Sequence, residues 1–204
     1  MKILRSILVI LLVIGMRVSV SVAEDIYVIQ ESAGIEKVAM LGDSIKNAEA
    51  TWGKADRVGK EDMYITDLFY EYHSRGALFT TDKTGVIKNI TLYANTGNKD
   101  PFHKTGLMWI NPSSIYQTFQ GATSKGLKFK DKLTPEDVYG IYGKPDNAIK
   151  GGSDVSVRLK EGKPLIIDNG KAGFTINYPD LGIAFEVFDG LVESCTLTMR
   201  DIKE

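Results

Sequence analysis

Residues 86–93 alternate between apolar and polar positions in the way that a half-buried β-strand does. One face of the expected strand carries Val86, Ile90 and Leu92. The other face carries a mostly polar set, namely Ile87, Asn89, Thr91 and Tyr93. Because antiparallel sheets commonly bury one face and leave the other in water, we expect the first face to meet helices and the second to stay open.

Similar short runs, separated by turns that contain glycine, aspartate or proline, predict a series of antiparallel strands. The runs fall into two groups, one in each half of the chain. The first group covers Leu68–Tyr72, Ala77–Thr81 and Val86–Tyr93. The second group covers Phe174–Tyr178, Ile183–Val187 and Leu191–Met199.

A short helix is expected before each group of strands. The stretches SIKNAEATWGKAD and TPEDVYGIYGKPD begin 90 positions apart, and each runs from a capping residue to an aromatic residue followed by glycine. Ser44 and Thr134 are the predicted N-caps, because their hydroxyls can accept hydrogen bonds from the first turn. Pro135 occupies its preferred first helical position. Gly53 and Gly143 stand where the end of a helix favours a left-handed residue.

The order of helix and strands recurs, and individual positions match. Tyr72 corresponds to Tyr178, and Phe79 corresponds to Phe185. Internal matching of this kind indicates a repeat. We therefore predict an α+β fold of two tandem units, each with short helices packed on one face of an antiparallel β-sheet. The expected divisions are a signal peptide at 1–23, a first repeat at 24–94, a connecting loop at 95–111 and a second repeat at 112–204.

The second repeat contains an insertion. Asp56 and Tyr72 are 16 positions apart, whereas the equivalent Asp146 and Tyr178 are 32 positions apart. The additional residues hold two apolar runs that are divided by a Glu-Gly-Lys turn. We expect these runs to form an inserted hairpin that extends the second sheet, and they are Val155–Leu159 and Pro164–Ile167.

Residues 1–23 have the three parts of an export signal. Lys2 and Arg5 supply the positive start, Ile7–Gly15 supplies the apolar centre, and Ala23 ends a small-residue cleavage site. The apolar centre is shorter than the roughly 20 residues of a spanning helix. We expect cleavage and no membrane span afterwards, and a retained anchor is the competing interpretation. The mature protein would be periplasmic or secreted.

Charge and cysteine content restrict the partners. Cleavage would remove three of the 25 basic residues and none of the 26 acidic ones, which leaves a mildly acidic protein. No nucleic-acid partner is expected, because phosphate binding needs a basic surface. The single cysteine, Cys195, excludes an intramolecular disulfide. It lies at an inward position of a predicted strand, where we expect it to be buried.

The sequence lacks the motifs of common enzymes, including the nucleophile elbow, the phosphate-binding loop and the dinucleotide fingerprint. His73 and His103 have no partner at the helical spacing that zinc sites use. The connecting loop carries oxygen atoms that suit calcium, on Asn95, Asn98 and Asp100. Their spacing does not match that of an EF-hand loop. We therefore predict no catalytic residue, no metal and no cofactor.

A helix followed by Gly-x-Pro-Asp, and then by strands that close on Gly-Ile-x-Phe, resembles two families of exported α+β proteins. The residues that carry the likeness are Thr134, Gly143, Pro145, Asp146, Gly182, Ile183 and Phe185. The chain is similar to the beta-lactamase inhibitor proteins, in which two such units form a concave surface that grips an enzyme. It also resembles the SmpA/OmlA envelope lipoproteins, which use a related unit in outer-membrane assembly. The resemblance implies a protein-binding fold, although the chain lacks the disulfides of the first family and the lipidated cysteine of the second.

Candidate binding residues lie where the two repeats differ. Phe102, His103 and Trp109 fall between the repeats, where large side chains suit an interface anchor. Tyr93 replaces a threonine on the open face of the first sheet, and Tyr70 is expected on the same face. Each has a structural alternative, because Trp109 could seal the seam between the repeats and the tyrosines could be half-buried sheet residues.

Two functions are compatible with these patterns. The first is an exported, non-catalytic module that binds another protein in the envelope or outside the cell, through its open sheet faces and the connecting loop. The second is an exported hydrolase, with a carboxylate and histidine site in a cleft between the repeats. The sequence favours the binding module, because no catalytic motif supports the hydrolase.

Overall fold

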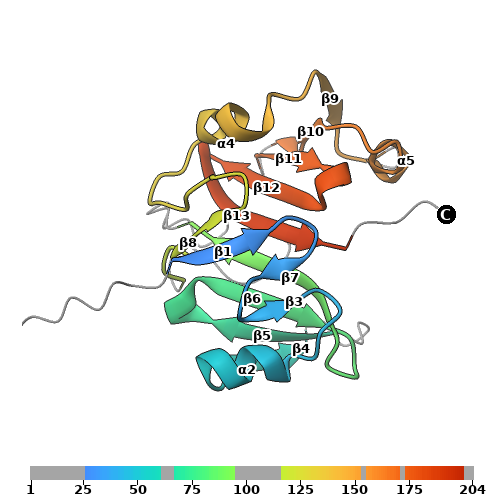
Figure 1. The fold of residues 1–204 in the computed structure, drawn as a ribbon. Helices are drawn as coiled ribbons and strands as arrows, with labels where there is room; N and C mark the ends of the chain where they lie inside the picture. The colour runs from blue at the N-terminus through green and yellow to red at the C-terminus, as the bar shows by residue number, and fades with distance from the viewer. Residues whose placement is uncertain (1–25, 61–66, 95–115, 153–154, 171–172, 200–204) are drawn as a thin grey trace, which may run out of the picture.

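The computed structural model describes residues 26–60, 67–94, 116–152, 155–170 and 173–199 (Figure 1). Within these ranges the chain is rich in strands and has few helices, which confirms a mixed α+β fold. The helices are α2 (Lys46–Trp52), α4 (Pro135–Tyr142) and α5 (Val155–Lys160), with 3-10 turns η1 (His73–Arg75) and η3 (Pro179–Leu181).

The described strands form two sheets. A four-stranded sheet has the order β3-β2-β1-β8 and a nine-stranded sheet has the order β4-β5-β6-β7-β13-β12-β11-β10-β9. The smaller sheet contains β1 (Tyr27–Gln30), β2 (Gly34–Ile35), β3 (Ala39–Met40) and β8 (Gly121–Thr123). The larger sheet contains β4 (Arg57–Lys60), β5 (Leu68–Tyr72), β6 (Ala77–Thr81), β7 (Ile87–Tyr93), β9 (Asn147–Lys150), β10 (Leu165–Asp168), β11 (Phe174–Tyr178), β12 (Ile183–Phe188) and β13 (Leu191–Thr198).

The six strands predicted in two groups are confirmed. β5, β6 and β11 have the predicted bounds, and β7, β12 and β13 each differ by one residue at one end. The last strands of the two groups pair with each other, with Thr91 opposite Thr196 and Leu92 opposite Cys195. Neighbouring strands run antiparallel throughout the described sheet, except that β9 and β10 run parallel. The two groups therefore form one continuous sheet.

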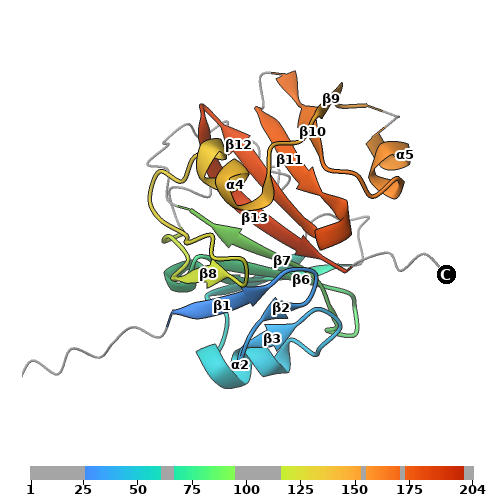
Figure 2. The ribbon, with the colours of Figure 1, turned by 45° about the horizontal axis from the view of Figure 1, so that its top comes forward.

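One face of the nine-stranded sheet is covered by α2, the four-stranded sheet and α4 (Figures 1 and 2). The main core lies in this layer. Ile29 and Ile35 from the small sheet, Ala48 from α2 and Val138 from α4 are all buried against it. Cys195 is a free, fully buried cysteine in the same core, as predicted. Short helices gain little stability by themselves, so this burial is what holds α2 and α4 in place.

Aromatic side chains fix the C-terminal end of α2 to the sheet. The ring centroids of Trp52, Tyr72 and Phe79 lie 5.4 to 5.7 Å from one another in edge-to-face arrangements. The Tyr72 hydroxyl donates a hydrogen bond of 3.3 Å to the carbonyl of Gly53, which follows the helix. A buried tyrosine needs such an acceptor for its hydroxyl. The helix end, the glycine and the sheet are therefore held together at one point.

The end of α4 is fixed in the same manner. Tyr142, Tyr178 and Phe185 pack with ring centroids 5.2 to 6.3 Å apart. The Tyr178 hydroxyl donates to the carbonyl of Gly143 at 2.6 Å. The residues that correspond in sequence therefore make corresponding contacts.

The turns after β5 and β11 also share one conformation. Each is a single 3-10 turn closed by a left-handed glycine, Gly76 with φ 63° or Gly182 with φ 56°. A Cβ atom at Gly76 would lie 2.2 Å from the carbonyl oxygen of Gln117, and one at Gly182 would lie 2.4 Å from that of Thr198. Both the backbone angle and the close approach of another chain segment require glycine.

The two helix starts differ from each other. At α4 the Thr134 side chain accepts a hydrogen bond from the Asp137 backbone, and the Asp137 carboxylate accepts one from the Thr134 backbone, which confirms the predicted cap. At α2 the N-cap position is occupied by Ile45, which makes no side-chain hydrogen bond, so the predicted cap is displaced by one residue. The Ser44 hydroxyl accepts only a long bond of 3.4 Å from the Lys46 amide, and Ser44 also forms a β-bridge with Val86.

Glu31 ties the turn after β1 to α4. The Tyr142 hydroxyl donates to one carboxylate oxygen of Glu31 at 2.8 Å, and the Ser124 hydroxyl donates to the other. Burial of Glu31 opposes its charge, but the hydrogen bonds from Ser124, Tyr142 and the backbone together lower its pKa below the usual value. Glu31 therefore stabilises the contact between the small sheet and α4 as a carboxylate.

The predicted inserted hairpin is wrong. Val155–Lys160 is helix α5, and only the second apolar run forms a strand, β10. β10 lies between β9, with which it runs parallel, and β11. A parallel pair needs a crossover connection, and a helix is the usual one. The alternating valines in this run have a high intrinsic preference for strands. The segment forms a helix because it has to connect two parallel strands.

A bulge changes the predicted face of one residue in β7. The register between β6 and β7 shifts after the pair Thr80 and Asn89, and Thr81 faces Ile87. Lys88 is the additional residue. Ile87, predicted on the polar face, is fully buried in the main core. The bulge explains this difference, because an extra residue in one strand moves the residues before it to the opposite face of the sheet.

Candidate functional site

Tyr70 and Tyr93, predicted to share the open face of the sheet, lie on opposite faces. Tyr70 stands opposite Phe79 and packs against the main core. Tyr93 stands opposite Ser194 and belongs to a second cluster. Residues directly opposite each other in a sheet share a face. The prediction is therefore wrong for Tyr70, and Tyr93 alone is on the face away from α2 and α4, which we call the open face.

Tyr93 is covered by a second aromatic residue, Tyr116. Their rings stack with centroids 4.1 Å apart and an interplanar angle of 25°. Each side chain is only 3% exposed, and Phe69 and Leu78 complete this small apolar cluster. The open face is therefore not bare over β5 to β7, and Tyr93 acts there as a buried sheet residue.

A fully buried carboxylate, Glu71, lies beside this cluster. One of its oxygens is 2.5 Å from Nε2 of His73, and the other is 3.5 Å from a guanidinium nitrogen of Arg57. The His73 ring also packs edge to face on Tyr116, with centroids 5.0 Å apart. A buried charge is tolerated when it is paired in this way. The arrangement orients the imidazole and fixes its Nε2 toward the carboxylate.

Two further glutamates approach Tyr93 from the neighbouring strands. Burial raises the pKa of the Tyr93 phenol far above its usual value, and the nearby carboxylates of Glu186, Glu71 and Glu193 raise it further. Burial likewise raises the pKa of Tyr116, helped by Tyr93 and Glu71. Both phenols therefore stay protonated across the neutral range. Ser194 donates to a carboxylate oxygen of Glu186 at 3.0 Å.

The other end of the open face is covered by α5. Leu165 stands opposite Asn177, and one cavity is lined by Leu165 together with Arg158 of α5. Leu165 and Ile167 are buried but lie outside the main core. We expected helices on only one face of the sheet. This expectation is wrong, because α5 covers part of the open face.

A strip of small, half-buried residues remains between these two covers. It follows one row of the sheet register from β7 through β13 and β12 to β11, and we call it the polar strip: Thr91, Thr196, Ala184 and Asn177. The hydroxyls of the two threonines are 3.1 Å apart, within hydrogen-bond distance. The strip runs across the boundary between β7 and β13, where the two groups of strands meet. It offers short hydrogen-bonding groups on a rigid sheet.

Phe102, His103 and Trp109 lie outside the described residues, so their roles stay predictions. The described residues on both sides of them are attached beside Tyr93. The Ala94 amide donates to the carbonyl of Glu193 at 2.9 Å, and the Phe119 amide donates to the carbonyl of Tyr93 at 2.8 Å. Both ends of the segment between the two groups of strands are thus fixed next to the open face.

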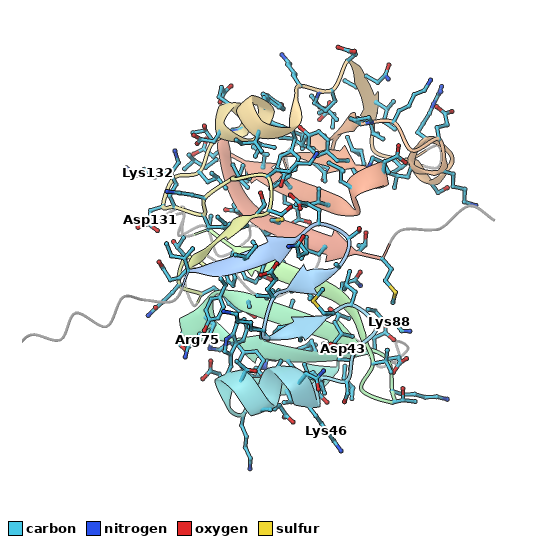
Figure 3. All side chains as sticks on the ribbon, in the orientation of Figure 1. Asp43, Lys46, Arg75, Lys88, Asp131 and Lys132 are labelled. Carbon is cyan, nitrogen blue, oxygen red and sulfur yellow. The ribbon has the colours of Figure 1, made fainter. Side chains whose placement is uncertain are left out.

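We also searched the described residues for metal ligands, a reactive thiol and a membrane-spanning helix. No group of three or more metal-ligating side chains occurs within it. Burial raises the pKa of the Cys195 thiol well above its usual value, which makes it a poor nucleophile. No helix among the described residues has the length and apolar character needed to cross a membrane. Charged side chains of both signs are interspersed at the periphery, as Asp131 and Lys132 illustrate (Figure 3).

Comparison with protein-family models, with curated proteins and with solved structures yields no match to this chain.

Sequence reasoning did not identify Glu71 or Tyr116 as site residues. Glu71 occupies an outward position in the alternating pattern, where a carboxylate normally meets water. It interacts with Tyr116, which comes from a distant segment.

Proposed function

We propose that the protein is an exported, non-catalytic binding module that engages another protein through its open face. It is built from two copies of one α+β unit. The proposal of two copies is supported by the matching hydrogen bonds from Tyr72 to Gly53 and from Tyr178 to Gly143. It is also supported by the central position of the β7 and β13 pair between the two groups of strands.

The polar strip is the observation that carries the binding proposal. Its side chains are half-buried, short and uncharged, and they lie on strands whose other face is anchored in the main core. A rigid surface loses little conformational entropy when a partner covers it. Threonine and asparagine side chains then supply the hydrogen bonds that such interfaces contain.

The likeness to the beta-lactamase inhibitor proteins and the SmpA/OmlA lipoproteins belongs to this proposal. Both families use related units to bind proteins, and the sequence resemblance extends that expectation to the present chain. The present chain differs in its source of rigidity. It has a single buried cysteine and no disulfide, and the aromatic clusters at Tyr72 and Tyr178 replace covalent links.

Capture of partners from the native envelope fraction tests the proposal. Thr196→Arg places a long charged side chain in the polar strip, and Asn47→Arg makes the same change on the exposed surface of α2. We expect Thr196→Arg to lose a protein that wild type and Asn47→Arg retain, while both variants melt within a few degrees of wild type. Equal retention by the three proteins would contradict binding at the open face.

The contact between His73 and Glu71 favours the exported hydrolase as a second candidate. An imidazole held by a buried carboxylate is a common general base. A panel of chromogenic esters and glycosides tests this function. Activity that disappears in His73→Gln, with the fold preserved, would establish it. If the wild-type protein is inactive toward the whole panel and Thr196→Arg loses its partner in the capture experiment, the binding module is the function supported.

A further inference from the structure

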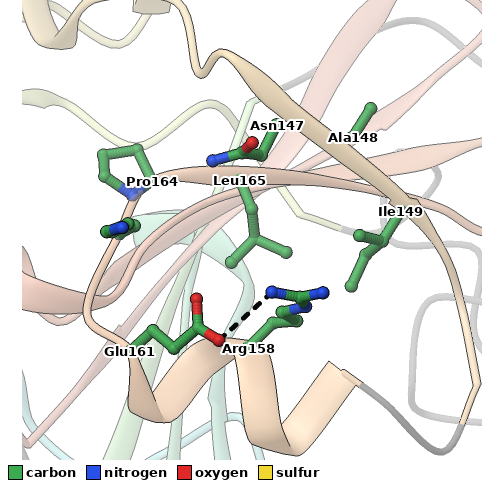
Figure 4. Close-up of a pocket in the computed structure, with 8 residues that line it drawn as sticks. Asn147, Ala148, Ile149, Arg158, Glu161, Pro164 and Leu165 are labelled. Atoms are coloured by element: carbon green, nitrogen blue, oxygen red, sulfur yellow. Dashed lines mark hydrogen bonds and ion pairs between the residues drawn. The ribbon is translucent and has the colours of Figure 1, made fainter.

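A separate cavity lies between α5 and the edge of the nine-stranded sheet (Figure 4). It has a volume of about 320 Å³. Its apolar floor comes from Leu165 of β10 and Ile149 of β9, with Asn147 beside them. Leu165 stands opposite Asn147 in the parallel pair of strands, so these side chains project from the sheet on the same side, toward α5.

The rim of this cavity is cationic. Arg158 and Lys163 line it together with one carboxylate, Glu161. A guanidinium nitrogen of Arg158 is 3.2 Å from the Glu161 carboxylate, and the Arg158 side chain is 57% exposed. Arginine has five N–H donors in a planar fork, so this single contact leaves donors for another carboxylate. Figure 4 shows the guanidinium between the helix and β9, below the end of the Leu165 side chain.

We propose that this cavity binds an amphipathic carboxylate, with the acid on Arg158 and Lys163 and the apolar portion on Leu165 and Ile149. The cavity volume lies at the lower end of the range of small-molecule sites, roughly 300 to 1,000 Å³. That size fits a small aryl or branched aliphatic acid, or the C-terminal residue of a peptide. The site adjoins the end of the polar strip, because Leu165 stands opposite Asn177, but it does not depend on the binding function proposed above.

Titration of the full mature chain with 3-phenylpropionate, followed by amide chemical shifts, tests the proposal. We expect saturable shifts in β9, β10 and α5, and a response at least about tenfold weaker to the neutral 3-phenylpropanamide, because a hydrogen bond to a charged group is lost. Equal responses to the acid and the amide, or the absence of saturable shifts in these elements, would overturn it.

Three variants locate the site. Arg158→Met keeps the aliphatic stem and should weaken binding of the acid by about tenfold or more. Glu161→Gln removes the competing carboxylate and should strengthen binding by about threefold. Lys160→Gln removes a charge from the same helix outside the cavity and should leave binding unchanged. Weaker binding in Glu161→Gln would contradict the proposal even if Arg158→Met failed to fold.

The peptide Ac-Gly-Phe-OH and its amide distinguish the two sources of the carboxylate. Saturable binding of the free peptide, but not of its amide, would identify a peptide C-terminus as the ligand class. Binding of 3-phenylpropionate without binding of the peptide would identify a free organic acid.

Discussion

Tyr178 donates a hydrogen bond of 2.6 Å to the carbonyl of Gly143, and thereby connects the end of α4 to β11. The equivalent bond at the end of α2, from Tyr72 to Gly53, is longer at 3.3 Å. Burial raises the pKa of Tyr178 above its usual value and that of Tyr72 to about 12, so both phenols remain donors across the neutral range. The same chemical contact therefore occurs twice with different geometry.

This difference predicts unequal effects of removing the hydroxyl. Tyr178→Phe should reduce the free energy of unfolding by about 1 to 2 kcal/mol, because the Gly143 carbonyl loses a well-formed hydrogen bond. Tyr72→Phe should cost about half as much, because a bond of 3.3 Å is near the limit of useful length. Urea denaturation of both variants measures this. A larger loss for Tyr72→Phe would contradict the account.

Gly76 provides a test of backbone strain. Gly76→Ala should reduce stability by about 3 kcal/mol or more, since a left-handed φ and a clash with the Gln117 carbonyl add together. Gly126→Ala is the matched control, because Gly126 also has a positive φ but its Cβ would meet no atom within 4 Å. The control should lose only about 1 kcal/mol. Similar melting temperatures for the two variants would show that the contact with Gln117 is unimportant.

Glu71 and His73 should be energetically coupled. His73→Ala leaves a fully buried carboxylate with one remaining ionic partner, Arg57, and should cost about 2 to 3 kcal/mol. The same change in a Glu71→Gln background should cost less than about 1 kcal/mol, because no buried charge then loses a partner. A double-mutant cycle by chemical denaturation measures the difference. Additive losses would argue against the pairing.

Stability should decrease in acid through Asp137 and Glu31. Hydrogen bonds from Lys130 and then from Thr134 outweigh the effect of burial and lower the pKa of Asp137, and the pKa of Glu31 is also lowered. The folded protein then binds fewer protons than the unfolded chain below the usual values of 3.8 and 4.5. The stabilisation is complete above these values and is lost as the pH falls through the lower folded pKa of each group.

Asp137→Asn isolates one part of this acid dependence. It removes the titrating group and half of the capping box, so it should cost about 1 kcal/mol at neutral pH. The difference in unfolding free energy between wild type and variant should then shrink as the pH falls below 3.8. Denaturation curves at several pH values follow this difference. A constant difference across that range would contradict the role of the charged carboxylate.

The strands were predictable from sequence because each has one buried face and a defined turn. β5, β6 and β11 follow the alternation without interruption, and their bounds were predicted accordingly. The side of Ile87 was not predictable, because the bulge at Lys88 leaves no signature in a pattern of apolar and polar residues. α5 was mistaken for a strand because its valines favour extended structure, and the need for a crossover appears only once β9 and β10 are known to pair.

The candidate site was less predictable than the fold. Tyr93 was found because it differs from its counterpart in the second group of strands, yet its burial depends on Tyr116 from a segment far along the chain. The pairing of Glu71 with His73 joins a strand to the turn that follows it, and the sequence shows neither the burial of the carboxylate nor the direction of the ring. Such features arise from packing between segments and have no local pattern.

Site-specific photocrosslinking in the native host tests the central claim most directly. A photoreactive amino acid at Asn177 would stand in the polar strip, and one at Lys46 would project from α2 on the opposite side of the sheet (Figure 3). Binding through the open face predicts a discrete crosslinked product from Asn177 and none from Lys46. A product from Lys46 alone, or none from either position, would contradict the proposal.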